Sequence, residues 1–235
     1  MREAPVERAA GLASGCRAIL LDFGGTLDAD GVAWKERMLG FYQLSGLDIS
    51  AERFDPAFYA ADDALVGTVP RRLGLTGTAE RLVSGLHGAL GIGVDVRARG
   101  IARRFSEDAI GRARSRRPLL SALARRYQLA IVSNFYGNLE AVCEECGIRD
   151  LFSAVVDSEV VGCGKPDARI FRAALDALGV APADAVFVGD SLRRDMAGAR
   201  GLGMPHVWLA PGARASGGCC PGDAVIRALD DLEGL

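Results

Sequence analysis

The hydrophobic pattern of this chain changes character twice. A continuous run of four apolar residues occurs near the N-terminus, and similar runs return after residue 128. Between them, the apolar residues recur at three- and four-residue spacing. A short apolar run is typical of a strand buried on both faces, whereas the second pattern is typical of an amphipathic helix. The chain is therefore predicted to form one strand, then a set of helices, then further strands.

The predicted strands alternate with helices after residue 117. Predicted strands span 18–21, 129–132, 154–156, 185–188 and 206–209, with 224–226 as a last edge strand. Predicted helices span 118–127, 139–146, 167–178 and 194–201, and 157–166 and 211–220 are expected to be loops. Alternation of this kind is typical of a parallel sheet covered by helices on both faces. The fold class is thus predicted as α/β, a doubly wound parallel sheet with a Rossmann-like core.

The stretch between the first two predicted strands reads as helical throughout. Apolar residues at helical spacing predict helices at 34–44, 54–65, 79–90 and 101–110. We interpret Trp34 as a packed aromatic residue rather than a residue of a cleft. The pattern favours an inserted helical domain at 31–117 and a core domain formed by 1–30 and 118–235.

Composition narrows the classes of partner. The 235 residues are 49% hydrophobic and carry a net charge of −2, with a pI of about 5.8. These values do not indicate binding to nucleic acid or to a membrane surface. No apolar run reaches the length of a membrane span. The sequence predicts a cytoplasmic protein and leaves its oligomeric state open.

Two groups of residues suggest sites but have simpler explanations. Cys143 and Cys146 form a C-x-x-C motif, and Cys219 and Cys220 are adjacent, a set that could bind zinc. The first two also continue an apolar helix stripe, which favours buried, reduced thiols. Arginines are dense between residues 97 and 117, and we interpret them as a solvated helix face balanced by acids rather than as a rim for anions.

Polar residues follow three of the predicted strands at the point where each ends. Asp22 follows the first strand, Ser133 and Asn134 follow the second, and Asp190 follows the run at 185–188. Ligands of open α/β sheets bind at the carboxyl edge of the strands, so these side chains are expected to converge there. Asp22 and Asp190 would repel each other unless a cation lay between them, and oxygen ligands of this type suit Mg²⁺.

A lysine completes this predicted cluster. The chain contains 28 lysines and arginines, of which only Lys35 and Lys165 are lysines. Lys165 lies in the loop expected at the same sheet edge. A compact ammonium can fit between a carboxylate and a phosphate oxygen where a guanidinium cannot. The retention of lysine here favours an anion-binding role.

These residues together resemble the motifs of the haloacid dehalogenase superfamily. The first motif is matched by Asp22-Phe-Gly-Gly-Thr26-Leu27-Asp28, the second by Ser133, the third by Lys165 in Gly-Lys-Pro-Asp, and the fourth by the acid-x₄-acid pair Asp190 and Asp195. All four occur in the order of the family, and the helical insert lies where its phosphatase-like subclass carries a cap domain.

The resemblance implies a magnesium-dependent phosphatase that acts on a small phosphorylated metabolite. Asp22 would attack phosphorus and form an aspartyl-phosphate. The implied metal group is Asp22, the Gly24 carbonyl, Asp190 and Asp195, with Asp195 positioning a metal-bound water or Lys165. The implied substrate contacts come from Gly24, Gly25, Ser133, the Asn134 backbone and Lys165. Asp22, Ser133 and Lys165 are the implied catalytic residues.

One position departs from the family pattern. Phosphatases of the superfamily usually carry a second Asp two residues after the nucleophile, which protonates the leaving group; here that residue is Gly24. General acid–base catalysis typically contributes about 10²–10⁴-fold. Asp28 or a cap residue could replace the acid, or the substrate could have a good leaving group.

Two alternative functions follow from this departure. The protein could bind phosphorylated ligands or partners with little turnover. It could also be a 2-haloacid dehalogenase, although dehalogenases of the family usually carry an aromatic residue at the position of Gly24 and need no metal. The intact pair Asp190 and Asp195 favours the metal-dependent phosphatase.

Overall fold

The computed structural model describes residues 15–93, 96–212 and 224–234. Its centre is a six-stranded sheet in the order β3-β2-β1-β4-β5-β6, with every neighbouring pair parallel. The strands are β1 (Ala18–Leu21), β2 (Gln128–Ser133), β3 (Ala154–Asp157), β4 (Ala185–Gly189), β5 (His206–Leu209) and β6 (Ala224–Ile226). This confirms the predicted α/β class, including the edge strand at 224–226.

Alternate residues of the central strand enter two different cores. Ile19 and Leu21 belong to a core under α6 (Arg117–Ala124) and α7 (Leu139–Cys146). Ala18 and Leu20 belong to a core under α9 (Ala168–Leu178) and α10 (Ala197–Gly201). All four of these β1 residues have no exposed surface. Burial on both faces explains why each strand is a continuous apolar run rather than an alternating one.

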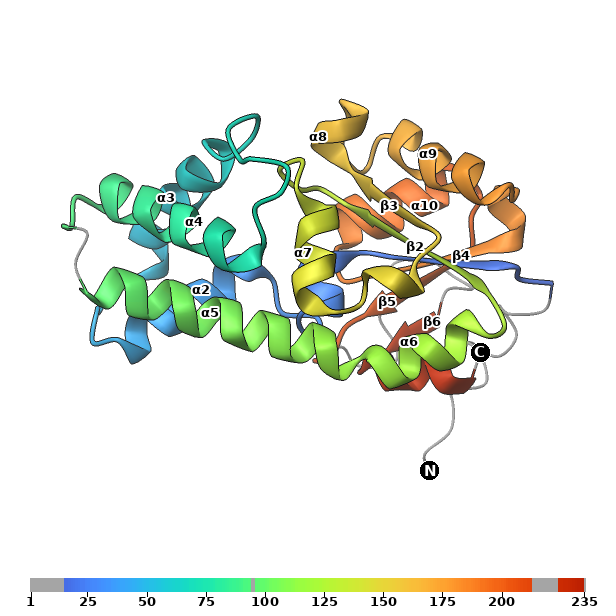
Figure 1. The fold of residues 1–235 in the computed structure, drawn as a ribbon, viewed down its shortest axis with the longest axis horizontal. Coiled ribbons are helices and arrows are strands. Elements are labelled where there is room, and N and C mark those ends of the chain that lie inside the picture. Colours follow the sequence, from blue (N-terminus) through green and yellow to red (C-terminus); the bar gives the residue numbers. More distant parts are fainter. Residues whose placement is uncertain (1–14, 94–95, 213–223, 235) are drawn as a thin grey trace.

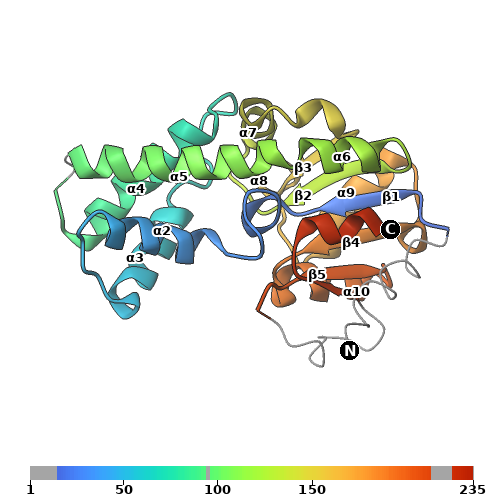
Figure 2. The ribbon, with the colours of Figure 1, turned by 90° about the horizontal axis from the view of Figure 1, so that it is seen from below.

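Four helices gather beside the sheet, on the left of Figure 1. They are α2 (Trp34–Leu44), α3 (Ala51–Asp63), α4 (Leu75–Leu90) and α5 (Val96–Ser115). Figure 2 shows α5 and α6 following one another along the same side of the molecule, so the long helix α5 leads back to the sheet. The four helices predicted between the first two strands are thus present, and α4 begins four residues earlier than the apolar pattern indicates.

Aromatic side chains join the helical insert to the sheet. The Trp34 ring of α2 packs edge-to-face against Phe105 of α5 at 5.1 Å and against Phe135, just after β2, at 5.6 Å. Phe135 in turn packs against Phe23 at 5.9 Å. Such pairs contribute about 0.5–1.5 kcal/mol each beyond their buried area. One hydrophobic core therefore continues from the sheet into the helices.

The short segments between elements show where sequence patterns were weakest. The chain forms helical turns at η1 (Phe23–Leu27) and η4 (Leu192–Met196), the second of which extends the predicted helix at 194–201 toward the N-terminus. A short helix, α8 (Ser158–Val161), lies in the segment predicted as a loop. Other short turns are η2 (Arg149–Leu151), η3 (Pro182–Asp184) and η5 (Leu229–Gly234). Most of the loop predicted at 211–220 lies outside the described residues.

The cysteines and arginines fit their simpler interpretations where they are described. Cys143 and Cys146 are fully buried free thiols on α7, and burial raises the pKa of both. Cys219 and Cys220 lie outside the described residues. Arg103 pairs with Glu107, and Arg112 pairs with Asp108. Within the described ranges, no helix is long and apolar enough to cross a membrane.

Candidate active site

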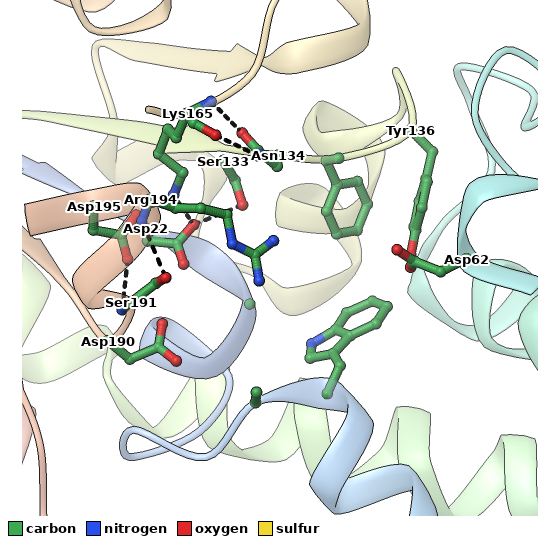
Figure 3. Close-up of a pocket in the computed structure, with 14 residues that line it drawn as sticks. Asp22, Asp62, Ser133, Asn134, Tyr136, Lys165, Asp190, Ser191, Arg194 and Asp195 are labelled. Carbon is green, nitrogen blue, oxygen red and sulfur yellow. Dashed lines mark hydrogen bonds and ion pairs between the residues drawn. The ribbon is translucent and has the colours of Figure 1, made fainter. Parts of the chain in front are cut away.

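A cavity of about 110 Å³ lies where the carboxyl ends of β1, β2 and β4 meet the helical insert (Figure 3). Parallel pairing sets this meeting point, because Leu21 lies between Ile131 and Val188 in register, and polar residues follow soon after all three. The cavity is lined by Asp22, Gly24, Ala33, Trp34, Asp62, Ser133, Asn134, Phe135, Tyr136, Lys165, Asp190, Ser191, Arg194 and Asp195. The structure thus brings together predicted residues that lie more than 160 positions apart.

Asp22 lies at the centre of a compact charge cluster. Its Oδ1 is 2.6 Å from Lys165 Nζ and accepts a hydrogen bond of 2.7 Å from Ser133 Oγ. Lys165 Nζ is also 2.7 Å from Asp195 Oδ1. Burial alone would lower the pKa of Lys165, but the ion pairs with Asp195 and Asp22 outweigh it, and the pKa is raised. Lys165 is therefore held as a buried ammonium between two carboxylates.

Asp190 brings a third carboxylate to the same place. Ligand oxygens of Asp22, Asp190 and Asp195 all lie within 4.8 Å of one another. Burial, together with the charges of Asp22 and Asp195, raises the pKa of Asp190 to about 7, with Lys165 acting in the opposite direction. Three carboxylates against one ammonium leave excess negative charge. This donor set fits a hard cation such as Mg²⁺, which binds oxygen ligands and favours carboxylates.

Gly25 and Asn134, both predicted to bind substrate, support the geometry of the charge cluster. Gly25 has a φ of +90°, and a Cβ built on it would lie 2.6 Å from Asp190 Oδ2, so only glycine allows this approach. The Asn134 side chain accepts a hydrogen bond of 2.7 Å from Lys165 N and donates one of 3.1 Å to Lys165 O. Gly25 therefore makes room for Asp190, and the Asn134 amide fixes the loop that carries Lys165.

An indole ring lies next to Gly24. A Cβ built on Gly24 would lie 3.4 Å from Trp34 Nε1. Trp34 also donates a hydrogen bond of 2.6 Å from this nitrogen to Asp28 Oδ2. Trp34 is 9% exposed, so it is packed as the sequence predicts, but it also lines the cavity, and the interpretation that it is not a residue of the cleft is wrong.

Asp28 is engaged elsewhere and does not line the cavity. Its carboxylate accepts hydrogen bonds from Gly25 N at 2.7 Å and from Trp34 Nε1, and it pairs with Arg37 Nη1 at 2.8 Å. Asp28 has no exposed surface, and burial raises its pKa although its partners lower it. Its role is to hold the first-motif turn against α2. The structure therefore argues against Asp28 as the replacement acid.

Replacing Asp28 with Ala should destabilise the protein strongly. The change leaves the Arg37 guanidinium, whose side chain is 8% exposed, without one of its two carboxylates, and it leaves two buried N–H groups unpaired. Breaking a buried pair in this way costs about 3–5 kcal/mol. We expect thermal unfolding to show a lower Tm by roughly 6–20 °C. Asp30→Ala, which removes a more exposed partner of Arg116, is the control; equal effects of the two variants would contradict this role of Asp28.

Four further polar residues of the cavity were not predicted as site residues from the sequence: Asp62, Tyr136, Ser191 and Arg194. Tyr136, close to the end of β2, donates a short hydrogen bond from its hydroxyl to Asp62 of α3. In the sequence, Arg194 lies between the two acids of the fourth motif. Figure 3 shows its guanidinium extending into the space between Asp22 and Asp62. The only sequence signal for Tyr136 and Arg194 is their closeness to Ser133 and Asp195. Asp62 carries no such signal, because it lies in the middle of the helical insert.

The fold and this site define an α/β protein with an acidic, lysine-containing centre at the sheet edge and a helical insert above it. Residues 16–203 match the family model of haloacid dehalogenase-like hydrolases, so the chain belongs to this family. The match covers the first strand, the helical insert and all four motifs.

Three known proteins illustrate the similarity. The chain is 44% identical over 103 residues to haloacid dehalogenase-like hydrolase domain-containing protein 3 of Mus musculus, covering 44% of this chain and 38% of that protein. It is 42% identical over 97 residues to phosphoserine phosphatase of Thermus thermophilus, covering 41% and 39%. The chain thus spans about two fifths of these curated relatives. The crystal structure of a HAD phosphatase from Thermococcus onnurineus matches 92% of this chain and 96% of its own, with a TM-score of 0.57 and 24% identity.

Proposed function

We propose that this protein is a magnesium-dependent phosphatase that acts through an aspartyl-phosphate on Asp22. The observation that carries the proposal is the cluster of Asp22, Asp190 and Asp195, whose oxygens lie within 4.8 Å of one another beside Lys165. Structural acids do not usually gather in this way without compensating charge, because like charges at this distance repel. The named phosphatase among the relatives supports a small phosphorylated substrate.

Each residue of the cluster has a defined part in the proposed reaction. An oxygen of Asp22 attacks phosphorus as the bond from phosphorus to the leaving oxygen breaks, and the leaving group departs with a proton from water. A water molecule then attacks the phosphorus of the aspartyl-phosphate, which releases phosphate and restores the Asp22 carboxylate. Lys165 neutralises charge on the Asp22 carboxylate and on the phosphoryl oxygens, and Ser133 Oγ and the Asn134 backbone hold that group. Asp22, the Gly24 carbonyl and Asp190 would hold Mg²⁺, and Asp195 would position Lys165 or a metal-bound water. When bound, the metal supplies positive charge to the phosphoryl oxygens.

The helical insert at 31–117 is proposed to act as a cap over this cluster. It contributes Trp34 and Asp62 to the cavity, whereas the cluster itself comes from the sheet. A cap of this kind excludes water and contacts the leaving group. The proposed core domain is 1–30 together with 118–235.

Hydrolysis of phosphate esters with graded leaving groups tests the proposal. With Gly24 in place of the usual acid, acetyl phosphate and p-nitrophenyl phosphate should be hydrolysed faster than simple alkyl phosphates by roughly 10²-fold or more, because the former need no proton on departure. Activity should require Mg²⁺ and be lost with EDTA. Absence of turnover, with ligand-dependent thermal stabilisation alone, would instead support a phospholigand-binding protein.

Asp190→Asn should raise the Tm of the metal-free protein and remove most of the increase in Tm that Mg²⁺ causes. The raised pKa of Asp190, about 7 against an unfolded value of 3.8, means that ionisation destabilises the metal-free fold increasingly as pH rises from about 4 to 7. The variant should therefore raise the Tm without metal at pH 8, and raise it less at pH 5. In the wild type, Mg²⁺ at 100 times its Kd should add about 2.7 kcal/mol.

The measurement is thermal unfolding at both pH values, with EDTA or Mg²⁺ at matched ionic strength. The Mg²⁺-induced rise in Tm should be largely lost in Asp190→Asn. An equal Mg²⁺ effect in both proteins would place the metal elsewhere.

A 2-haloacid dehalogenase is the second candidate, and Trp34 is the observation that favours it. Dehalogenases of the family usually carry an aromatic residue at the position of Gly24, and here the Trp34 indole lies next to that glycine. Halide release from a 2-haloacid that EDTA does not affect would favour this function over the phosphatase.

A further inference from the structure

The cap side of the cavity carries polar groups that the proposed reaction does not use. Asp62, Tyr136 and Arg194 line the same cavity as Asp22. Figure 3 shows Asp62 and Tyr136 on the side of the helical insert, and the Arg194 guanidinium extends from the side of Asp22 into the space between Asp22 and Asp62. Asp62 comes from α3, Tyr136 follows β2, and Arg194 lies in η4. Three separate elements therefore bring one acid, one phenol and one guanidinium to the place where a leaving group would extend.

Asp62 is held in position by Tyr136 but keeps a free oxygen. The Tyr136 hydroxyl donates to Asp62 Oδ1, whereas Oδ2 accepts no hydrogen bond from the described residues. Burial raises the pKa of the Asp62 carboxyl, and the Tyr136 hydrogen bond and Arg194 partly offset this. Burial and Asp62 also raise the pKa of Tyr136, which keeps its proton. Asp62 Oδ2 is therefore an oriented acceptor available to a ligand.

Arg194 supplies the complementary charge. Its side chain forms no hydrogen bond or ion pair with the described residues, although its backbone N–H is bonded to Ser191 Oγ at 3.3 Å. Its positive charge lowers the pKa of both Asp62 and Tyr136, so it lies within electrostatic range of the pair. The matched neighbour Arg193 does not line the cavity. Arg194 is an exposed residue whose guanidinium also lines the cavity, where it can bind a carboxylate or a phosphate.

Two aromatic rings form an apolar wall beside these groups. The rings of Trp34 and Phe135 pack edge-to-face at 5.6 Å and line the cavity. The polar contacts of a leaving group are therefore left to Asp62, Tyr136 and Arg194.

We infer that Asp62, Tyr136 and Arg194 form a leaving-group subsite, which selects small phosphate esters whose leaving group carries both a hydrogen-bond donor and a carboxylate. The donor, an ammonium or hydroxyl group, binds Asp62 Oδ2, and the carboxylate binds Arg194. The inference rests on the proposed phosphatase function, since it assigns the substrate class of the same cavity. A site built around such polar groups rejects analogues that lack the matching groups, because its own groups would then be left unpaired.

Two isosteric pairs of esters separate the two contacts. Phosphoethanolamine and propyl phosphate differ by an ammonium in place of a methyl group, and phosphoglycolate and isobutyl phosphate differ by a carboxylate in place of a branched alkyl end. For each pair we take the kcat/KM of the charged ester divided by the kcat/KM of its alkyl analogue. We expect Asp62→Asn to reduce the ratio of phosphoethanolamine to propyl phosphate roughly tenfold or more. Arg194→Gln should reduce the ratio of phosphoglycolate to isobutyl phosphate by a similar factor. Asp63→Asn and Arg193→Gln, at the exposed neighbouring residues, are the matched controls and should leave both ratios at wild-type values.

The same ratios measured as Kd values by calorimetry, with Mg²⁺ present, test the subsite without turnover. If hydrolysis is absent but the Kd ratios shift as expected, the phosphatase function fails and the subsite stands. If Asp62→Asn leaves the first ratio unchanged, Asp62 does not bind the leaving group. If Arg194→Gln weakens all four esters equally, Arg194 contacts the phosphoryl group instead. Either of these last results overturns the inference.

Discussion

Asp22→Asn should reduce the hydrolysis of every ester by at least about 10³-fold. The amide is nearly the same size as the carboxylate and can still accept the hydrogen bond from Ser133 Oγ, but it cannot attack phosphorus. Lys165 keeps its second ion pair with Asp195, so the buried ammonium is not left unpaired. We therefore expect loss of catalysis without loss of the fold, measured as kcat/KM together with Tm.

Asp184→Asn is a suitable control for this experiment. Asp184 immediately precedes β4, whereas Asp190 follows it, so the control removes a carboxylate at the opposite edge of the sheet. Its activity should match that of the wild type. Residual activity of Asp22→Asn within tenfold of the wild type would show that another residue is the nucleophile. A Tm reduced by more than about 10 °C would show that Asp22 has a structural role instead.

Gly24→Asp should increase the turnover of alkyl phosphates by about 10²-fold, at the lower end of what general acid–base catalysis contributes. Gly24 has a φ of −75° and a ψ of 117°, which any residue adopts, and its Cβ would meet Trp34 at ordinary contact distance. The new carboxylate would lie beside the cavity next to Asp22, where the resemblance places the missing acid. Turnover of acetyl phosphate should change far less, because its leaving group needs no proton.

Gly24→Asn is the control, since it adds a side chain of the same size without a transferable proton. It should not accelerate alkyl esters. If Asp and Asn have the same effect, general acid catalysis is not what this position lacks. If Gly24→Asp accelerates good and poor leaving groups equally, the carboxylate acts on the attack rather than on the departure.

The fold could be predicted because its strands are buried on both faces. Ala18–Leu21 has no exposed side chain in the structure, and such a run leaves a continuous apolar signal in the sequence. Parallel alternation of strands and helices then places Asp22, Ser133 and Asp190 at one edge, whatever their separation along the chain. Short helical turns were less predictable: α8 (Ser158–Val161) has no fully buried residue and hence no apolar periodicity.

The cap side of the cavity could not be predicted, because its contacts join residues with no common pattern. Asp62 and Tyr136 are 74 positions apart, and each also fits a helix surface or a loop when considered alone. For Asp28, the sequence suggested a role in the site that the structure does not support. Its place in the first motif made it a candidate acid, yet its hydrogen bonds with Gly25 and Trp34 and its ion pair with Arg37 commit it to structure.

The sequence by itself thus determined the α/β class and the positions of the polar residues that follow the strands. It also determined which chemical groups, carboxylates with a hydroxyl and an ammonium, meet at that edge of the sheet. These properties depend on local periodicity and on the fixed geometry of parallel sheets. The tertiary structure alone decided that Asp62 lines the cavity and Asp28 does not, which residue lies next to Gly24, and which side chains surround a leaving group. Those outcomes depend on how helices pack against the sheet, and such packing is set by the shapes of many distant side chains rather than by any one stretch of the chain.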